Sequence, residues 1–330
     1  MQTFILRRLL IGAVIIVFLS IAVFFVLHIV PGNPAQQRCG LSCKPEQIKA
    51  IEHDLGLDKP LWPVSFNGSS PFIHFGDSQY GDWVKSLFTG DLGVSTYYHQ
   101  PVSTALKQRL PVTFELMVLT MIFTIVVGVP FGIISAVWRN SPVDYVVRTT
   151  AILGLSVPNF WIATLVLIVP LALWNYSPPI GRTISFTSDP IGNLKQFGPP
   201  AAVLALASAA GIMRLARSSL LEVLRQDYMR TARAKGLRER AVVLSHGLKN
   251  SLIPVVTVLG LQMAGLLGGA IIIEVIFTLH GLGEYAFQEL LYKDFQVVQT
   301  ITVYVGAVVI LLNLLVDVSY AWFDPRIRYS

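Results

Sequence analysis

No nucleophile, metal ligand or glycine-rich loop of this chain stands in a spacing that catalysis requires. The sequence contains no G-x-x-x-x-G-K-[ST], H-E-x-x-H or G-x-S-x-G pattern and no cluster of Cys and His. His280 and Glu284 are four residues apart, but the glycine-containing turn at 281–283 separates them. We therefore predict no catalytic residue, no metal site and no cofactor bound by this chain.

Acidic side chains inside apolar segments are the next candidates. Glu115, Glu274 and Asp317 lie within or at the edge of such segments, and Asn159 follows Pro158 near the middle of another. Ionisable groups are costly in a membrane and are functional candidates by default. We expect Glu115, Asn159 and Glu274 to be candidates for lining a path through the membrane. A structural hydrogen bond to a neighbouring helix is the open alternative for the acids, and packing against another span is the alternative for Asn159.

The most informative polar stretch is the basic segment at residues 217–253. We expect Asp227 to cap a short helix that ends at Gly236, a natural left-handed stop. A second helix then follows from Glu239 to Lys249, before Pro254. A loop that only reverses direction needs far fewer residues, so this segment predicts a rigid projection that meets a partner. The alternative is a solvated basic surface beside anionic lipid.

Long apolar blocks must position these polar residues. The chain is 53% hydrophobic and 13% charged, about half the charge of a typical soluble domain. A spanning helix needs about 20 mostly apolar residues, and six blocks meet this requirement. The first block, at residues 9–30, is too long for a signal peptide, and no cleavage pattern follows it. The six predicted spans are Leu9–Val30, Thr113–Trp138, Thr149–Trp174, Pro199–Ala216, Pro254–Leu279 and Gln299–Phe323.

The distribution of basic residues predicts the orientation. Fifteen of the 25 Lys and Arg residues fall in four segments: 1–8, 139–148, 214–253 and 324–330. Cytoplasmic segments carry the excess of Lys and Arg in membrane proteins. We therefore predict an all-α polytopic membrane protein with six transmembrane helices and both termini inside. The net charge of +6 then describes cytoplasmic segments, not a nucleic-acid surface.

Residues 31–112 form one large predicted outer loop, which is too long for a simple connector. Trp83–Phe88 is expected to form a short helix on the membrane surface, with apolar anchors. Cys39 and Cys43 are the only cysteines, and their spacing permits a disulfide outside the cell. Two free thiols are the alternative. The segment from Asn67 to Pro71 is typical of a turn.

Several motifs then occur in an order that resembles the permeases of ABC importers. The segment Arg230–Gly236 is similar to their coupling loop, in which Ala232 and Gly236 match and Arg230 and Thr231 depart. The resemblance covers nearly the whole chain and indicates the first permease subunit of the dipeptide/oligopeptide (peptide/nickel) branch. The other matching motifs are Arg7-Arg8, Pro31–Pro34, Leu55–Pro60, Gly90–Ser95, Pro111–Leu116, Gly281–Gly283, Asn313–Asp317 and Asp324–Arg328.

The resemblance implies a type I ABC importer permease fold in a bacterial inner membrane, working by alternating access. It implies three segments: an N-terminal helix at 1–30, an outer loop at 31–112 and a five-helix core at 113–330. Its implied partners are a second permease subunit, two ATPase subunits that hold ATP and magnesium, an extracytoplasmic binding protein and membrane lipid, without nucleic acid. The implied coupling residues are Asp227, Tyr228, Arg230, Thr231, Ala232, Arg233, Ala234, Lys235, Gly236 and Leu237.

One departure from the family concerns the outer loop. An insertion near Val64–Ser78 precedes Gln79-Tyr80, on the face where the family docks its binding protein. The substrate stays open among dipeptides, oligopeptides, glutathione, nickel chelates and sugars. A secondary transporter or channel is the alternative function, but that class favours inverted repeats and midplane charges. A membrane-embedded enzyme would need a catalytic set that the sequence does not offer.

Overall fold

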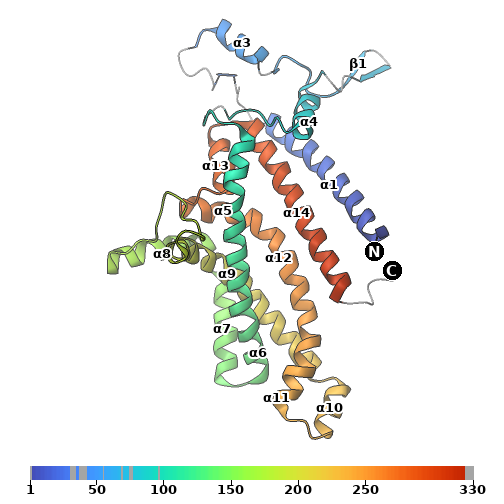
Figure 1. Cartoon of the computed structure of the whole chain (residues 1–330), viewed down its shortest axis with the longest axis vertical. Coiled ribbons are helices and arrows are strands. Elements are labelled where there is room, and N and C mark those ends of the chain that lie inside the picture. The colour runs from blue at the N-terminus through green and yellow to red at the C-terminus, as the bar shows by residue number, and fades with distance from the viewer. Residues whose placement is uncertain are drawn as a thin grey trace. The chain divides into compact units, whose positions relative to one another are not determined.

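The computed structural model describes residues 2–29, 35–36, 43–54, 56–67, 70–73, 77–95 and 97–323. The chain forms two compact units, each described by itself. The larger unit comprises Val112–Gly283 with the chain from Leu311 onward, and the smaller unit comprises Gln2–Pro111 with Glu284–Ile310. Figure 1 labels the helices and strands of both.

Five helical segments are long and apolar enough to span a membrane within the described part of the chain. A sixth span results if one bent helix pair counts as a single crossing. The prediction of an almost entirely helical, polytopic protein is therefore confirmed. The five segments lie in α1 (Gln2–Ile29), in α5 (Val102–Phe123) continued by η1 (Thr124–Gly128) and α6 (Val129–Val137), in α9 (Pro190–Val223), in α11 (Glu239–Ala241) continued by η2 (Val242–Gly247) and α12 (Leu248–Ile276), and in α14 (Phe295–Phe323).

The bent pair occupies the third predicted span. Helix α7 (Pro142–Ser156) and helix α8 (Asn159–Trp174) meet at an angle of 99°, and α8 turns away sharply in Figure 1. Val157 and Pro158 are both extended, with ψ angles of 128° and 132°. The residue before a proline avoids the helical region. The predicted kink at Pro158 is thus a complete break between two helices.

Several helix boundaries differ from the sequence prediction. Helix α1 begins at Gln2 rather than Leu9, and α5 begins at Val102 rather than Thr113. Helix α9 begins at Pro190 rather than Pro199 and has 34 residues, which corresponds to about 51 Å. The helix after Gly236 does not stop before Pro254. It runs from α11 (Glu239–Ala241) through the π-helical turn η2 (Val242–Gly247) directly into α12, so Pro254 lies inside a continuous helix.

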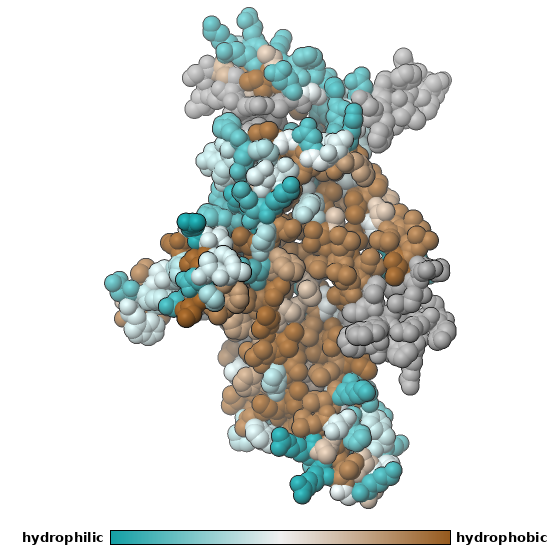
Figure 2. Space-filling model, viewed as in Figure 1, coloured by the Kyte–Doolittle hydropathy of each residue, from teal (hydrophilic) through white to brown (hydrophobic). Residues whose placement is uncertain are grey.

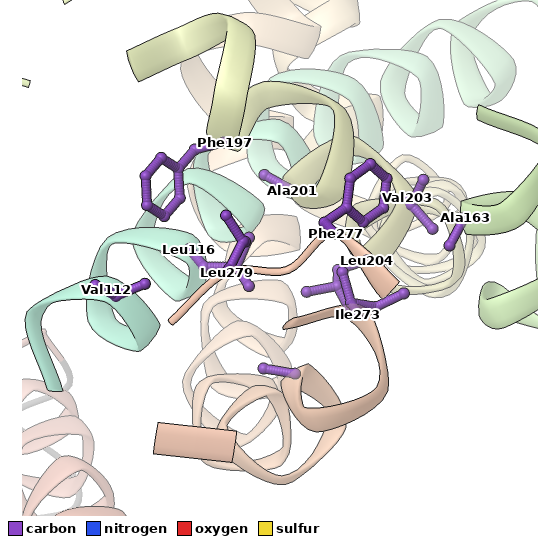
Figure 3. Close-up of a cluster of buried hydrophobic side chains, with 11 residues drawn as sticks. Val112, Leu116, Ala163, Phe197, Ala201, Val203, Leu204, Ile273, Phe277 and Leu279 are labelled. Atoms are coloured by element: carbon purple, nitrogen blue, oxygen red, sulfur yellow. The ribbon is translucent and has the colours of Figure 1, made fainter. Parts of the chain in front are cut away.

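The main core of the larger unit joins four helices (Figure 3). Apolar side chains from α5, α8 and α9 meet the C-terminal end of α12 and the turn that follows it. These helices present bulky buried groups in the middle of otherwise apolar segments, where close packing sets their positions. The buried members of this cluster are Val112, Leu116, Ala163, Phe197, Ala201, Val203, Leu204, Ala270, Ile273, Phe277 and Leu279.

The smaller unit contains α1, α3 (Pro45–Asp54), α4 (Gln79–Thr89) and most of α13 (Leu282–Leu291). It also holds an antiparallel strand pair, β1 (Val64–Asn67) and β2 (Ser70–Ile73), which lies in the predicted insertion. The expected helix at Trp83–Phe88 exists as part of α4.

Trp83 does not act as a surface anchor, because it is only 4% exposed and packs with Phe24, Tyr80 and Val303. Phe88 is the exposed aromatic residue of α4. Cys39 lies outside the described residues, so the disulfide with Cys43 stays a prediction.

Candidate functional site

The segment after α9 forms the short helix α10 (Asp227–Ala234). Asp227 is its first helical residue, and the N-cap is Gln226, whose side chain makes no capping hydrogen bond. The prediction that Asp227 is the N-cap was therefore wrong by one residue. The extended backbone of Gln226 (φ −68°, ψ 150°) fixes the helix start. The Asp227 carboxylate instead lies in the first turn, where the helix dipole favours negative charge.

Helix α10 is held by a small apolar cluster. Met229 is completely buried, and Ala232 and Val242 pack with it against Leu224 at the end of α9. Gly247 lies close by, since a Cβ added there would be 3.5 Å from the methyl of Met229. Met229 thus fixes α10 to both α9 and η2. It was not among the predicted coupling residues, although its spacing from Ala232 marks one apolar face.

Gly236 ends α10 as predicted. Its φ is +78°, in the left-handed region that favours glycine, and a Cβ at this position would meet no atom within 4 Å. Only backbone conformation therefore requires glycine here. Beyond the turn, the Arg233 guanidinium donates to both Glu239 oxygens at 3.0 and 2.8 Å. This carboxylate raises the pKa of Arg233 above its ordinary value, and the pair joins α10 to α11.

The outward face of this unit is polar. The side chains of Asp227 and Arg230 are 96% and 76% exposed and lie 3.5 Å apart. The Tyr228 hydroxyl accepts a hydrogen bond from Asn250 at 3.0 Å. Figure 2 shows hydrophilic residues gathered at the end where Figure 1 places α10 and α11. Nine of the ten predicted residues are exposed: Asp227, Tyr228, Arg230, Thr231, Arg233, Ala234, Lys235, Gly236 and Leu237.

Ala232 is the exception, since it faces the buried cluster. Three exposed basic side chains, Arg230, Arg233 and Lys235, remain on α10 and its last turn. The structure therefore presents a short, anchored helix with a charged outer face. Such a surface can bind a complementary protein surface.

Glu274 lies at the opposite end of α12 and is fully buried. The Thr113 hydroxyl donates to its Oε1 at 2.7 Å and accepts from the Leu282 amide at 2.8 Å. A Cβ at Gly281 would collide with the Glu274 carboxylate, and one at Gly283 would come within 3.0 Å of it. Glu274 therefore fastens the turn after α12 to α5. We call these five residues the turn lock.

Glu115 and Asn159 occupy different surroundings. The Glu115 carboxylate accepts a hydrogen bond from Asn193 Nδ2 at 2.6 Å, and the same amide donates to the carbonyl of Ile184 at 2.8 Å. Asn159 is the half-buried first residue of α8, at the break after Pro158. The carboxylates of Glu115 and Glu274 thus accept hydrogen bonds from different partners. Their role in a translocation path stays a prediction, and the side chain of Asp317 lies outside the described set.

An ion pair with a buried carboxylate is one of the polar contacts that sequence reasoning missed. The Asp144 carboxylate is completely buried. It accepts hydrogen bonds from Arg217 Nε at 2.8 Å and from Arg217 Nη2 at 2.9 Å. The Ser135 hydroxyl and the Asn140 amide also donate to Asp144. The contact joins α6, α7 and α9. The only signal in the sequence was an acidic residue and a basic residue, 73 positions apart, each near the end of an apolar segment.

Comparison with known protein families identifies the chain. Residues 128–329 match the family described as the binding-protein-dependent transport system inner membrane component. Residues 1–117 match the N-terminal membrane-component family of the same transport systems. The chain belongs to this family. It is a multi-pass permease component of the bacterial inner membrane, as the sequence motifs predicted.

Curated relatives extend over the full length of this permease. It is 37% identical over 348 residues to the dipeptide transport system permease protein DppB of Alkalihalophilus pseudofirmus. It is 38% identical over 355 residues to DppB of Escherichia coli K12. A putative peptide transport system permease protein of Brucella abortus is 38% identical over 330 residues. Each alignment covers 100% of both chains.

Among solved structures, a chain of the MetNI methionine ABC transporter in an inward-facing conformation has the same fold. The TM-score is 0.55 at 18% sequence identity, with 66% of this permease and 96% of that chain covered. A second crystal form of the same transporter gives a TM-score of 0.53. The predicted type I ABC importer permease fold is therefore confirmed.

Proposed function

We propose that this permease and a second homologous subunit form the translocation path of an ATP-driven importer of dipeptides or oligopeptides. Two ATPase subunits bind ATP and magnesium and supply the energy. An extracytoplasmic binding protein delivers the substrate. The permease itself changes conformation and exposes the path alternately to the two sides.

The names of the full-length relatives support a peptide substrate. Dipeptide permeases from two organisms and a putative peptide permease from a third are 37–38% identical to this chain, each aligned from end to end. The carboxylates of Glu115 and Glu274 both accept hydrogen bonds within the protein, and the proposal does not require either of them to bind a peptide terminus.

The observation that carries the coupling role is the anchored helix α10. A segment that transmits a push must be stiff, because a soft loop would absorb the movement. Met229 is buried beneath α10, Gly236 closes the helix, and the Arg233–Glu239 pair joins it to the helix that continues into α12. A displacement of α10 by an ATPase subunit would therefore move α12 and α9.

Gly236→Val tests this role. A β-branched residue at φ +78° is strained, so the turn after α10 should distort. We expect peptide-stimulated ATP hydrolysis and uptake in proteoliposomes to fall about tenfold, given a local cost of about 1–3 kcal/mol. Gly181→Val is the matched control. Gly181 has φ +95°, and a Cβ there would also meet no atom within 4 Å, yet it lies far along the chain from α10.

The control should keep uptake within about twofold of the unmodified protein while carrying a comparable backbone cost. Full coupling in Gly236→Val would contradict the role of this turn. Peptide uptake by the chain without any ATPase subunit would contradict the importer proposal itself and favour a secondary transporter.

A further inference from the structure

A cleft between α7 and α9 in the larger unit has no part in the proposed coupling. Its volume is about 240 Å³. Helix α7 contributes Arg148, Ile152 and Leu155 to its lining, and helix α9 contributes Arg214 and Arg217. The cleft therefore lies beside the Asp144–Arg217 pair, of which Arg217 forms part of the wall.

The charge of this cleft is positive. Arg217 is neutralised by its two hydrogen bonds to the buried Asp144 carboxylate. Arg148 and Arg214 are exposed and have no carboxylate partner among the residues that the structure describes. The Arg148 guanidinium lies 5.9 Å from the centroid of the Tyr145 ring. Two unneutralised guanidinium groups thus line one small cavity, which favours an anionic occupant.

Part of the remaining wall is apolar and exposed. Ile152 and Leu155 lie four and seven residues after Arg148, so all three share one face of α7 over about 10 Å. Ile152 is 61% exposed and Leu155 is 43% exposed, although both belong to a helix of a candidate span. In a membrane these side chains face acyl chains. The arginines therefore mark the polar end of a cleft whose other end is apolar.

We propose that this cleft binds one anionic phospholipid, with its phosphate at Arg148 and Arg214 and an acyl chain along Ile152 and Leu155. Basic pockets between transmembrane helices are suited to anionic lipid headgroups. An acidic protein segment from the cytoplasm would satisfy the arginines but would leave the apolar wall uncovered. A phospholipid satisfies both ends, and the bound lipid would join α7 to α9 beside the break at Pro158.

Native mass spectrometry of the full chain, purified with its companion subunits, tests the proposal. The probes are dioleoyl phosphatidylglycerol and dioleoyl phosphatidylcholine in equal amounts. We expect the unmodified protein to retain one phosphatidylglycerol in preference to phosphatidylcholine. The double variant Arg148→Gln/Arg214→Gln should lower this occupancy at least about tenfold. Both side chains are exposed, and the Asp144–Arg217 pair is kept, so the fold should persist.

Arg139→Gln/Arg225→Gln is the matched control, since it removes two exposed arginines that do not line the cleft. This variant should retain phosphatidylglycerol within about twofold of the unmodified protein. Equal losses in both double variants, or no loss in either, would overturn the proposal. Displacement of the lipid by millimolar inorganic phosphate would also overturn it, because the acyl chain would then contribute nothing.

A photoreactive phenylalanine in place of Ile152 separates lipid from protein as the occupant. Crosslinking to phosphatidylglycerol would support the proposal. Crosslinking to a companion subunit instead would show a protein interface and overturn it. Neither readout depends on transport, so failure here leaves the proposed importer function untouched.

Discussion

The charged residues near the two ends of α12 differ in their burial. At its C-terminal end, Glu274 is fully buried and accepts from the Thr113 hydroxyl at 2.7 Å, against the glycines of the turn lock. At its N-terminal end, the helix is continuous with η2 and α11, and the charges of α10 stay exposed. Met229 and its apolar neighbours are buried there, as are Val243 and the uncharged Ser251.

The difference separates polar groups that hold the fold from polar groups that are available to a partner. A buried carboxylate must have its hydrogen bonds satisfied internally, so Glu274 is committed to the turn lock. The exposed side chains of Asp227 and Arg230 are 3.5 Å apart in solvent, where an ion pair contributes little. Substitutions at the first end should therefore act on stability, and those at the second end on partner-dependent activity.

Glu274→Leu should have the largest effect on stability. It removes the acceptor of the Thr113 hydroxyl and leaves that donor buried, which we expect to cost about 3 kcal/mol. Denaturant titration of the detergent-solubilised permease, followed by circular dichroism, measures the change. Glu274→Gln is the control, because it keeps an acceptor oxygen of the same shape and should cost less. Equal stability of Glu274→Leu and the unmodified protein would remove the contrast between the two ends of α12.

Met229→Ala should have a smaller and local effect. Truncating a buried methionine costs about 2 kcal/mol or more, but this cluster supports only α10, η2 and the end of α9. We expect amide hydrogen exchange in residues 227–241 to accelerate about thirtyfold while global unfolding changes little. Met229→Leu conserves volume and should exchange at nearly the unmodified rate. A global loss of stability in Met229→Ala would show that α10 belongs to the main core.

Sequence reasoning predicted the spans and the end of α10 because each depends on local chemistry. Apolar length determines a transmembrane helix, and Gly236 adopts the left-handed conformation that few other residues tolerate. Pro158 likewise indicated a bend at the junction of α7 and α8. The size of that break, 99°, depends on packing against other helices and could not be read from one proline.

Contacts between distant segments were not predictable in the same way. The Asp144–Arg217 pair joins residues 73 apart, and the Thr113–Glu274 hydrogen bond joins residues 161 apart. Neither partner specifies the other, because many polar residues at span ends could have paired. Trp83 illustrates the same limit. Its apolar character was evident, but its burial against Phe24 rather than lipid depends on tertiary structure.

Arg233→Ala should have the smallest effect on stability. It tests whether the charges near α10 contribute less to stability than the buried Glu274 does. The pair with Glu239 is bidentate, yet its side chains are 38% and 60% exposed, so solvent screening limits its contribution to about 1 kcal/mol or less. We expect the opening free energy of α10, from hydrogen exchange, to fall by that amount. Arg233→Ala, Glu239→Ala and the double variant form a thermodynamic cycle, in which the double variant should open no more readily than either single one. A coupling well above 1 kcal/mol would mean that the α10 end, like the turn lock, is stabilised by its charges rather than by Met229 alone.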